Sequence, residues 1–410
     1  MEFIKKKNIF RIIMLILLTA FITFLLTTIF MYSKVEPYLV GKTLTTTSNK
    51  TSNMTGLTQK LSNIKTCLTQ MYRGEINDND LLEGAIKGYV EGLGDEYTEY
   101  FTAEEMKNFL EDTTGKYVGI GIYMQKNSND DNILVLSTMK GSPAEQVGLK
   151  SGDIITKIDG EECANQELSV SSDKIKGEEG TKVNLEIYRG SGEILNFEIE
   201  RKPIEVNQVA SEKLDDDIGY IEIASFNENV ATHFEEHYRE LEKQGIKSLI
   251  IDLRNNGGGI VDEALYIAET MVNKGDTLLI KSDKDDKEDV TVSKKDPIVK
   301  VPVVVLINEY SASASEILAG ILHDNIGTKL IGTKSYGKGV IQTAFSMSDG
   351  SGLKITTNEY FTPNHNTINK TGINPDVEVE LPDEFKYSLV VEKAQDTQLQ
   401  KAIEVLKTDM

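Results

Sequence analysis

Two uninterrupted apolar runs restrict the fold of this chain more than any other feature of its sequence. The runs "SLIIDL" (248–253) and "PVVVLI" (302–307) lack the alternation of apolar and polar residues that a half-exposed strand shows. Strands of this kind are typical of parallel sheets that are buried on both faces. Helical patterns over 228–243, from about 260 and from about 314 alternate with strands in this part of the chain. The sequence therefore predicts an α/β domain at 203–387.

The segment before this domain has a different pattern. Residues 113–202 contain short strand-like runs such as "NILVLSTM" and "KVNLEIYRG", separated by turn residues, and one short helix-like piece, "SPAEQVGL". We expect a second, β-rich domain there. Apolar side chains recur at helical spacing in residues 59–112, which predicts an N-terminal helical segment. Residues 388–410 are expected to contain a C-terminal helix.

An apolar, uncharged run at 12–32 follows a basic N-terminal stretch at 1–11. At about 1.5 Å per residue, the run is long enough to cross a hydrocarbon core of about 30 Å. It ends without the small residues of a cleavage site, so we expect a retained membrane anchor rather than a cleaved signal peptide. The basic flank predicts a cytoplasmic N-terminus and an extracytoplasmic remainder. Residues 33–58, rich in Thr, Ser and Asn, are expected to form a flexible tether.

Charge and cysteine content exclude several classes of function. The net charge of −21 argues against nucleic acid and anionic lipid surfaces as ligands of the outer part. The only two cysteines, Cys67 and Cys163, fall in different predicted segments, which excludes a disulfide scaffold. The sequence implies neither a metal nor an organic cofactor.

A serine nucleophile is suggested by "INEYSASASEILAGIL" (307–322), which reads as the end of a strand, a turn and a helix. A serine in that turn lies at a helix N-terminus, where free N–H groups and the positive end of the dipole can stabilise an oxyanion. Ser313 and Glu316 also match the capping box S-x-x-E, and neighbouring serines can divide the two roles. None of the four histidines has a local signature that ties it to a serine, so a Ser-His-Asp triad is not indicated.

Two chemistries compete for Lys338 in "LIGTKSYGKGVIQT" (330–343). The glycines and the lysine match the phosphate-loop spacing G-x4-G-K, but Gly339 stands where Ser or Thr is needed for Mg²⁺, and a strand-like run follows instead of a helix. Alternatively, a neutral Lys338 is the general base for a serine, with Gln342 on the same strand face to hold the amine. An exposed lysine at a strand end remains the plain alternative.

A rival chemistry is suggested by "HFEEH" (233–237), which matches the inverted zinc-protease motif H-x-x-E-H. The alternative is a solvated helix in which Val230, Phe234 and Leu241 form the buried stripe. Patterns of five residues often arise by chance in a polar helix. The helix is therefore the favoured interpretation.

In combination, "INEYSASASEILAGILHDN" and "LIGTKSYGKGVIQ" strongly resemble the C-terminal processing (tail-specific) proteases, the S41 serine peptidases with a Ser/Lys dyad. The stretches "GYIEIASF", "LIIDLRNNGGG" and "YFTPNHNTINKTGINPDVEV" agree, and residues 113–202 resemble a PDZ domain. The resemblance covers residues 75–385 approximately. With the apolar run, it implies an α/β peptidase domain with a ClpP/crotonase-like core, a β-rich PDZ domain, an N-terminal helical segment and one transmembrane helix.

The resemblance also assigns roles to individual residues. It implies that Ser313 is the nucleophile, that Lys338 is the general base and that Gln342 orients the lysine. The oxyanion donors would be the backbone N–H groups of Ala314 and Gly258.

In the PDZ domain, the resemblance implies a carboxylate-binding loop at Val118, Gly119, Ile120 and Gly121. Arg189 resembles a PDZ arginine that helps to align the active site in some members of the family; an exposed turn arginine is the alternative.

The chain departs from the family pattern at two positions. Gly257 replaces the usual Pro or small residue, and His365 replaces the usual Gly, at a position that we interpret as structural. Neither departure touches the dyad.

The sequence therefore predicts a membrane-anchored, extracytoplasmic serine endopeptidase. Its PDZ domain would capture apolar C-terminal tails of proteins or peptides, and the dyad would cut nearby. The helical segment at 59–112 and the C-terminal helix are candidates for a homodimer interface. A tethered PDZ adaptor with an inactive peptidase domain is the rival from another class; the complete set of Ser313, Lys338 and Gln342 argues against it.

Overall fold

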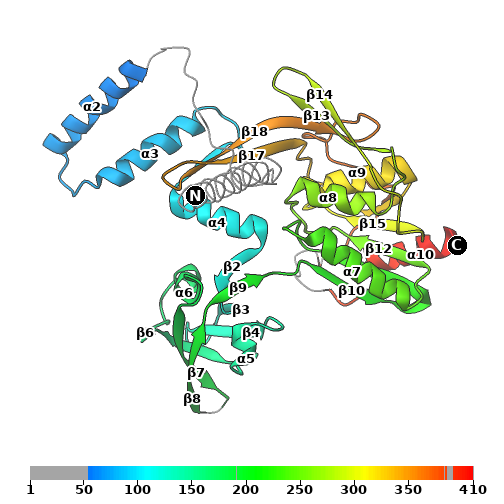
Figure 1. Ribbon diagram of the computed structural model, residues 1–410, viewed down its shortest axis with the longest axis horizontal. Helices are drawn as coiled ribbons and strands as arrows, with labels where there is room; N and C mark the ends of the chain where they lie inside the picture. The colour runs from blue at the N-terminus through cyan, green and yellow to red at the C-terminus, as the bar shows by residue number, and fades with distance from the viewer. Residues whose placement is uncertain (1–53, 191, 383, 386–390, 410) are drawn as a thin grey trace, which may run out of the picture. The chain divides into compact units, whose positions relative to one another are not determined.

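The computed structural model describes residues 54–409, except 191, 383 and 386–390 (Figure 1). The predicted membrane anchor at 12–32 and its basic flank lie outside these residues. Within the described part, no helix combines the length and the apolar character needed to cross a membrane.

The chain divides into two units. The first unit contains the residues up to Met106 and Gln342–Thr356, and the second contains Lys107–Ile341 and Thr357–Met410.

The first unit combines N-terminal helices with the end of a long β-hairpin. Its elements are α2 (Met54–Met71), α3 (Asp78–Glu91), β1 (Glu99–Phe101), the start of α4 (Ala103–Thr114), and parts of β17 (Val340–Ser346) and β18 (Gly352–Phe361). Asn77 caps α3 by accepting a hydrogen bond from the N–H of Asn79. β1 pairs antiparallel with β18, so that Glu99 lies opposite Lys354. The predicted helical segment is present, but α2 begins at Met54, so the last residues of the predicted tether at 33–58 are helical; the three-residue strand β1 was not predicted.

The β-rich part of the second unit contains a sheet in the order β3-β4-β5-β7-β8, with β6 beside β5. Its elements are β3 (Ile122–Lys126), β4 (Ile133–Thr138), α5 (Pro143–Gln146), β5 (Ile154–Ile158), β6 (Glu161–Glu162), α6 (Leu168–Ile175), β7 (Lys182–Arg189) and β8 (Glu193–Glu200). Alternate residues of β7, Val183, Leu185 and Ile187, are fully buried in its core. A separate antiparallel ribbon joins β2 (Lys116–Gly119) to β9 (Lys202–Glu205). The predicted β-rich fold is confirmed.

The α/β part of the second unit is built on a six-stranded sheet in the order β10-β11-β12-β15-β16-β19. Its strands are β10 (Val209–Lys213), β11 (Ile218–Ile223), β12 (Ser248–Asp252), β15 (Val303–Ile307), β16 (Lys329–Gly332) and β19 (Val377–Glu378). β10 is antiparallel to β11, and the neighbouring pairs from β11 to β19 are parallel. Every residue of β12 is buried, which explains its uninterrupted apolar run.

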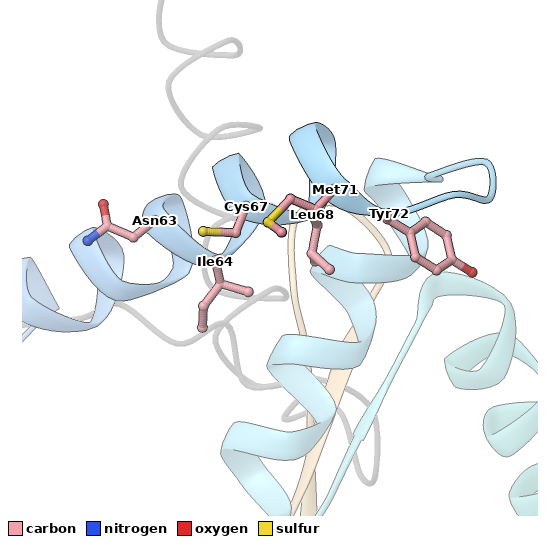
Figure 2. A pocket seen from close by; sticks show the side chains of 6 residues that line it. All are labelled: Asn63, Ile64, Cys67, Leu68, Met71 and Tyr72. Carbon is pink, nitrogen blue, oxygen red and sulfur yellow. The ribbon is translucent and has the colours of Figure 1, made fainter.

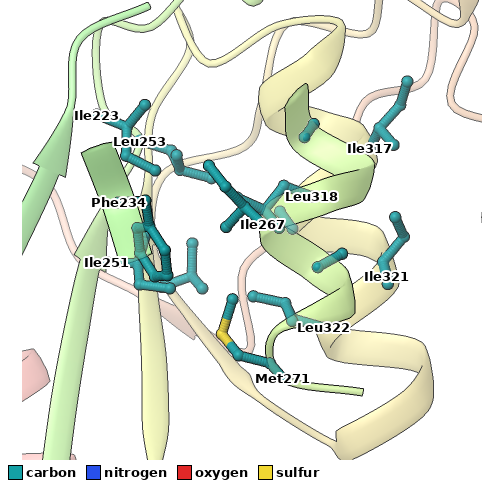
Figure 3. Packing of buried hydrophobic residues seen from close by; sticks show 14 of the residues in the cluster. Ile223, Phe234, Ile251, Leu253, Ile267, Met271, Ile317, Leu318, Ile321 and Leu322 are labelled. Atoms are coloured by element: carbon teal, nitrogen blue, oxygen red, sulfur yellow. The ribbon is translucent and has the colours of Figure 1, made fainter. Parts of the chain in front are cut away.

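Helices cover both faces of this sheet. α7 (Val230–Lys243), α8 (Val261–Glu269) and α9 (Ala314–Ile326) pack on one face, where Ile251 lies in one buried cluster with Phe234, Ile267 and Leu318 (Figure 3). On the other face, Ile250 belongs to a cluster with residues of α10 (Thr397–Asp409). The expected C-terminal helix is therefore present and begins at Thr397.

The remaining elements of the second unit are a short 3-10 helix (Asp215–Asp217) and the hairpin of β13 (Thr277–Asp283) and β14 (Glu288–Val292). β13 also pairs with the second half of β18, at Asn358–Phe361. Because β12, β15 and β16 are parallel, their carboxyl ends lie at one edge of the sheet, and the loops that follow them meet there. These loops carry the residues of the predicted site.

Candidate active site

Ser313 lies in the turn between β15 and α9, as the sequence predicted. It is 8% exposed, and its backbone has φ 54° and ψ −114°, a left-handed value of φ that is uncommon for a residue other than glycine. Such conformations persist only where the surrounding contacts hold them, and they concentrate at functional sites. The turn is held by the N–H of Ala312, which donates to the Asn256 carbonyl at 3.0 Å.

The two neighbouring serines have structural roles. The Ser311 hydroxyl donates to the Leu253 carbonyl at 2.8 Å, and the Ser315 hydroxyl donates to the Asn256 carbonyl at 2.9 Å. Both serines are fully buried. Their hydroxyls fasten this turn to the loop after β12, so Ser313 is the member of the trio best suited to act as a nucleophile.

Gly258 packs directly against this turn, with φ +102°. A Cβ at Gly258 would lie 2.7 Å from the Ala312 carbonyl oxygen, 2.8 Å from the Ser313 Cβ and 3.0 Å from the Ala314 nitrogen. Only glycine fits such an approach. The structure therefore brings together Gly258 and Ala314, the two residues expected to supply oxyanion donors.

The two donors differ in their present partners. Ala314 is the first residue of α9, so its N–H belongs to the first turn, where no acceptor exists within the helix. The N–H of Gly258 donates to Asn256 Oδ1 at 2.9 Å. Gly258 can therefore hold an oxyanion only after this bond is released. The neighbouring Gly257, which departs from the family pattern, has nothing within 4 Å of the position of a Cβ.

The buried carboxylate of Glu316 joins the nucleophile turn to the lysine loop. Its Oε2 accepts the backbone N–H groups of Ser313 and Lys338, both at 2.9 Å. Its Oε1 accepts the Gly337 N–H at 2.7 Å and the Ser335 hydroxyl at 2.6 Å. Burial raises the pKa of Glu316, and these four donors act in the opposite direction. The sequence identified Glu316 only as a helix cap; its second set of partners, 19 to 22 residues away, leaves no local pattern.

Tyr360 provides a second bridge between the same two segments. Its side chain is fully buried, and its hydroxyl donates to the Lys338 carbonyl and lies 3.3 Å from the Ser313 carbonyl oxygen. Its backbone N–H donates to the Gly339 carbonyl at 2.9 Å. Glu316 thus holds the N–H groups of Ser313 and Lys338, while Tyr360 holds their carbonyls. Sequence reasoning missed this tyrosine, because nothing in the pattern of a strand marks which residue reaches a distant loop.

Close packing explains the glycines around Lys338. A Cβ at Gly339 would lie 2.3 Å from the Asn369 nitrogen, and one at Gly337 would lie 2.9 Å from the Gly372 nitrogen. The strand β17 follows the lysine, whereas a phosphate loop would be followed by a helix. Gly337 of the G-x4-G-K pattern, like Gly339 after the lysine, therefore allows a close backbone contact.

Gln342 belongs to the first unit, where its Nε2 donates to the Thr356 hydroxyl at 3.3 Å.

The predicted carboxylate-binding loop lies at the end of β2. Ile120 is fully buried, and its carbonyl accepts the N–H of Ala144 at 2.9 Å. Gly121 has φ +74°, and a Cβ there would lie 2.5 Å from the Ser142 Cβ. Val118 and Gly119 are the last residues of β2. The loop is thus tightly packed against the start of α5.

Arg189 binds within the β-rich domain. Its guanidinium contacts both carboxylate oxygens of Asp153, each at 2.7 Å, and donates to the Gly148 carbonyl at 2.9 Å. Asp153 is only 1% exposed. In this conformation Arg189 is therefore the partner of a buried carboxylate rather than an exposed turn residue.

The zinc alternative rests on the H-x-x-E-H residues of α7. In α7, His237 Nδ1 lies 2.6 Å from the Ser211 hydroxyl, and burial lowers the pKa of this histidine. Val230, Phe234 and Leu241 are buried, as expected of a solvated helix with an apolar stripe. No group of three or more His, Cys, Asp or Glu that could hold a metal occurs among the residues that the structure describes.

His365, the second departure from the family pattern, has φ +61°, a value that glycine adopts without strain. Its ring stacks on Phe361, with 4.7 Å between the centroids, and its Nε2 lies 2.8 Å from Glu288 Oε1. These contacts are structural and involve neither Ser313 nor Lys338.

The chain is a multidomain protein with a buried serine at a helix N-terminus of its α/β domain and a separate β-rich domain, and comparisons with known proteins identify its family. Residues 217–379 match the model of peptidase family S41, and 134–189 match a PDZ domain. Residues 16–105 match the N-terminal domain of the activating protease CtpB.

Named relatives agree with these matches. The carboxy-terminal processing protease CtpA of Bacillus subtilis is 38% identical over 315 residues, which cover 77% of this chain and 67% of the relative. A probable CtpA-like serine protease of Staphylococcus haemolyticus is 36% identical over 359 residues, 85% of this chain and 72% of the relative. The crystal structure of a putative S41 protease from Bacteroides fragilis shares the fold: it is 18% identical, has a TM-score of 0.51 and covers 83% of this chain and 94% of that one.

The chain belongs to the S41 peptidase family. Within that family it is a C-terminal processing serine peptidase that carries a PDZ domain.

Proposed function

We propose that this peptidase works through a dyad of Ser313 and Lys338, and that it is anchored in a membrane with its catalytic part outside the cytoplasm. The observation that carries the dyad is the Glu316 carboxylate, one oxygen of which accepts the backbone N–H of both residues at 2.9 Å. The engagement of the Ser311 and Ser315 hydroxyls with backbone carbonyls supports the choice of serine.

In this mechanism the neutral amine of Lys338 accepts the proton of the Ser313 hydroxyl, and the serine oxygen attacks the scissile carbonyl. The protonated amine then gives this proton to the leaving nitrogen of the cleaved peptide bond. Water afterwards hydrolyses the acyl-enzyme at Ser313. The N–H groups of Ala314 and Gly258 would hold the oxyanion of each tetrahedral intermediate. Because the Gly258 N–H donates to Asn256 in the present conformation, the proposal includes a local shift of this loop when substrate binds.

The test of the dyad is cleavage of an unstructured protein such as casein by the full chain. Ser313→Ala and Lys338→Ala should each abolish cleavage while the circular dichroism spectrum stays unchanged, because the two residues act as one unit. Lys338→Arg should also be inactive, since a guanidinium does not lose its proton in a protein. Near-normal activity of Ser313→Ala would contradict the proposal. A wild type that cleaves nothing would favour the alternative of a tethered PDZ adaptor with an inactive peptidase domain.

Tail recognition is a further part of the proposal. The loop Val118–Gly121 would receive the carboxylate of an apolar C-terminal tail, and the dyad would cut upstream of it. Two observations support a built loop: the burial of Ile120 and the positive φ of Gly121. A peptide ending in an apolar residue should bind Ser313→Ala protein, and its C-terminal amide should bind at least about tenfold more weakly, the effect of losing roughly one charged hydrogen bond. Equal affinities would contradict this recognition.

We also propose that tail binding gates cleavage. The Asn227 side chain donates to the carbonyls of Asp112 and Thr113, at the segment that leads into β2. The neighbouring Phe226 donates its N–H to the Gly258 carbonyl at 3.0 Å. These contacts support a route from the entrance of the PDZ domain to the oxyanion loop. A ligand shifts such an equilibrium only by its differential affinity for the two states.

The proposed anchor is residues 12–32, on the sequence argument given above. If it is correct, the full chain should fractionate with membranes until detergent is added, and a variant that begins at residue 33 should not. An external protease should also reach the catalytic part in intact cells. Recovery of the full chain in the soluble fraction would contradict the anchor.

A homodimer is proposed through the apolar surface of α2 and α3, which have no buried residues. Ile64, Met71 and Tyr89 are 55%, 83% and 68% exposed. Ile64, Cys67 and Met71 line a shallow groove along α2 (Figure 2). Cys67 is exposed and Cys163 is buried, so a short bis-maleimide should link two copies through Cys67. A Cys67→Ser control should not cross-link, and a monomer by light scattering would overturn the dimer.

A further inference from the structure

Arg254 joins the loop after β12 to the start of α10. Its guanidinium donates to both carboxylate oxygens of Asp396, with Nη1 3.0 Å from Oδ1 and Nη2 2.8 Å from Oδ2. Nη1 also donates to Gln398 Oε1 at 3.0 Å. Asp396 immediately precedes α10, and Gln398 lies in its first turn. The C-terminal helix thus binds a residue of the same loop that carries Gly258.

The other acceptor of Arg254 is Asp252, the last residue of β12. Nε lies 3.0 Å from both carboxylate oxygens of Asp252, and Nη2 lies 2.6 Å from Oδ2. Each N–H group of the guanidinium therefore has an acceptor. Only 12% of the Arg254 side chain is exposed, against 5% for Asp252 and 8% for Asp396. Burial lowers the pKa of Arg254, but the charges and hydrogen bonds of the two carboxylates outweigh it and raise this pKa.

Stability alone does not explain a cluster of buried charges. Charges lose hydration when they are buried, and apolar side chains of similar volume often stabilise a fold equally well. The ion pair adds a defined geometry, because the planar guanidinium binds a carboxylate through two parallel N–H donors. Asp396 is itself fixed, since its Oδ1 accepts the Leu399 N–H at 2.9 Å and caps α10. Leu399 and Leu406 bury this helix against the sheet, so it forms a firm base for Arg254.

The loop after β12 needs such a base. Consecutive glycines occupy 257–259, and Gly258 has φ +102°. Glycine allows many backbone conformations, so the surrounding contacts must select one. Asn256 fastens the loop to the nucleophile turn, because its carbonyl accepts the Ala312 N–H at 3.0 Å. Arg254 fastens the start of the same loop to α10.

We propose that Arg254 and Asp396 are positioning residues that hold the loop after β12 where the Gly258 N–H can reach the oxyanion. This rests on the proposed function, in which that N–H is an oxyanion donor. Both residues act through the loop rather than on the substrate. α10 contributes no residue to the dyad, yet through this ion pair it helps to determine the rate of turnover.

The kinetic signature differs from that of a stabilising contact. Oxyanion donors act in the transition state, so displacing one lowers kcat and leaves KM nearly unchanged. A peptide aldehyde, to whose carbonyl carbon the Ser313 oxygen adds, uses the same donors. Its inhibition constant should therefore rise as kcat falls, while the corresponding peptide alcohol should bind equally well. A variant that is merely less stable would contain fewer active molecules, each with the kcat of the wild type.

The experiment compares Asp396→Asn and Arg254→Lys in the full chain, with a fluorophosphonate to count the active molecules. Asparagine keeps an acceptor that caps α10 but sets an NH₂ group against the guanidinium, and lysine keeps the charge without the planar fork. Each change should lower kcat per active molecule, and raise the inhibition constant of the aldehyde, by at least about tenfold.

Glu404→Gln is the matched control on the same helix. Its exposed carboxylate accepts from Lys401 Nζ at 2.7 Å. Surface ion pairs of this kind contribute little. Both kcat and the inhibition constant of the aldehyde should therefore stay unchanged in this variant.

The outcomes separate this inference from the proposed function. If Gly258→Ala keeps full activity, the oxyanion role of this glycine fails. If Gly258→Ala is inactive while Asp396→Asn and Arg254→Lys keep the wild-type kcat per active molecule, the positioning role is overturned and the dyad stands. A fall in the number of active molecules alone would also overturn it. Should one of the two variants not fold, the other decides; failure of both to fold would make the ion pair structural and overturn the inference.

Discussion

At the scale of single residues, adjacent glycines in the loop after β12 offer a matched test of the site. Gly258→Ala should abolish cleavage, because its Cβ would lie 2.7 Å from the Ala312 carbonyl oxygen and force the nucleophile turn to move. Gly257→Ala should keep at least about half of the activity, since nothing lies within 4 Å of its Cβ position and surface changes of this kind are usually small. Peptide hydrolysis measures both. Equal effects would show that the loop as a whole, rather than the approach of Gly258, limits activity.

Glu316→Gln tests the carboxylate that holds both halves of the dyad. An amide NH₂ group would replace one oxygen and face two N–H donors, each of which costs about 1–3 kcal/mol when left unpaired. We expect kcat to fall by at least about tenfold while the protein remains folded. Activity close to that of the wild type would show that Glu316 only caps α9.

The same variant has a defined pH dependence. Burial raises the pKa of Glu316, so the folded protein takes up this proton more readily than the unfolded chain. The contribution of Glu316 to stability is therefore fullest at low pH and is lost as pH rises through its folded pKa. Glutamine does not titrate. The unfolding free energy of the wild type minus that of Glu316→Gln, measured with urea, should increase as pH is lowered from neutral toward 4.5, the ordinary pKa of a glutamate.

At this scale, the sequence could predict a residue's role where the neighbouring residues in the chain indicate that role. Ser313 and Lys338 lie in stretches whose own pattern is distinctive. The second role of Glu316 and the whole role of Tyr360 depend on partners that the fold brings from other segments. The engagement of the Gly258 N–H by Asn256 is likewise a matter of side-chain conformation, which spacing does not determine.

At the scale of elements, the buried strands were predicted correctly, whereas the start of one helix and a short strand at a sheet edge were not. β12 and β15 could be predicted because a strand that is buried on both faces needs an uninterrupted apolar run. The helix expected at 228–243 begins at Val230, after the left-handed Asn229. β1 was missed because three residues are too few to show a period, and its existence depends on pairing with β18.

α10 offers a test of an element far from the dyad. Leu399 and Leu406 are 2% and 1% exposed, and they cover the face of the sheet opposite to α7, α8 and α9. Leu406→Ala should lower the free energy of unfolding by about 2–5 kcal/mol through lost burial and the cavity left behind. Gln400→Ala, on the exposed side of the helix, should change it by less than about 0.5 kcal/mol. Urea titration distinguishes them, and similar values would mean that α10 is dispensable for the core.

At the scale of the whole molecule, the proposed gate requires communication between tail binding and cleavage. Arg189 is the residue that family resemblance nominates, and here it pairs with the buried carboxylate of Asp153. Removing either side chain leaves the remaining charge without its ion-pair partner. An unpaired charge is destabilising when it is buried. Loss of stimulation in Arg189→Ala alone would therefore not separate a signalling role from damage to the PDZ domain.

A pair of variants separates the two. We measure cleavage of one internal peptide with and without a second, uncleavable peptide that ends in an apolar residue, in wild type, Arg189→Ala and Asp153→Ala. If Arg189 aligns the active site after tail binding, Asp153→Ala frees it and should keep or increase the stimulation, while Arg189→Ala should lose it. Equal loss in both would make the ion pair purely structural. If the added peptide only competes, even in the wild type, the gate itself is wrong, because a ligand that favours neither state shifts no equilibrium.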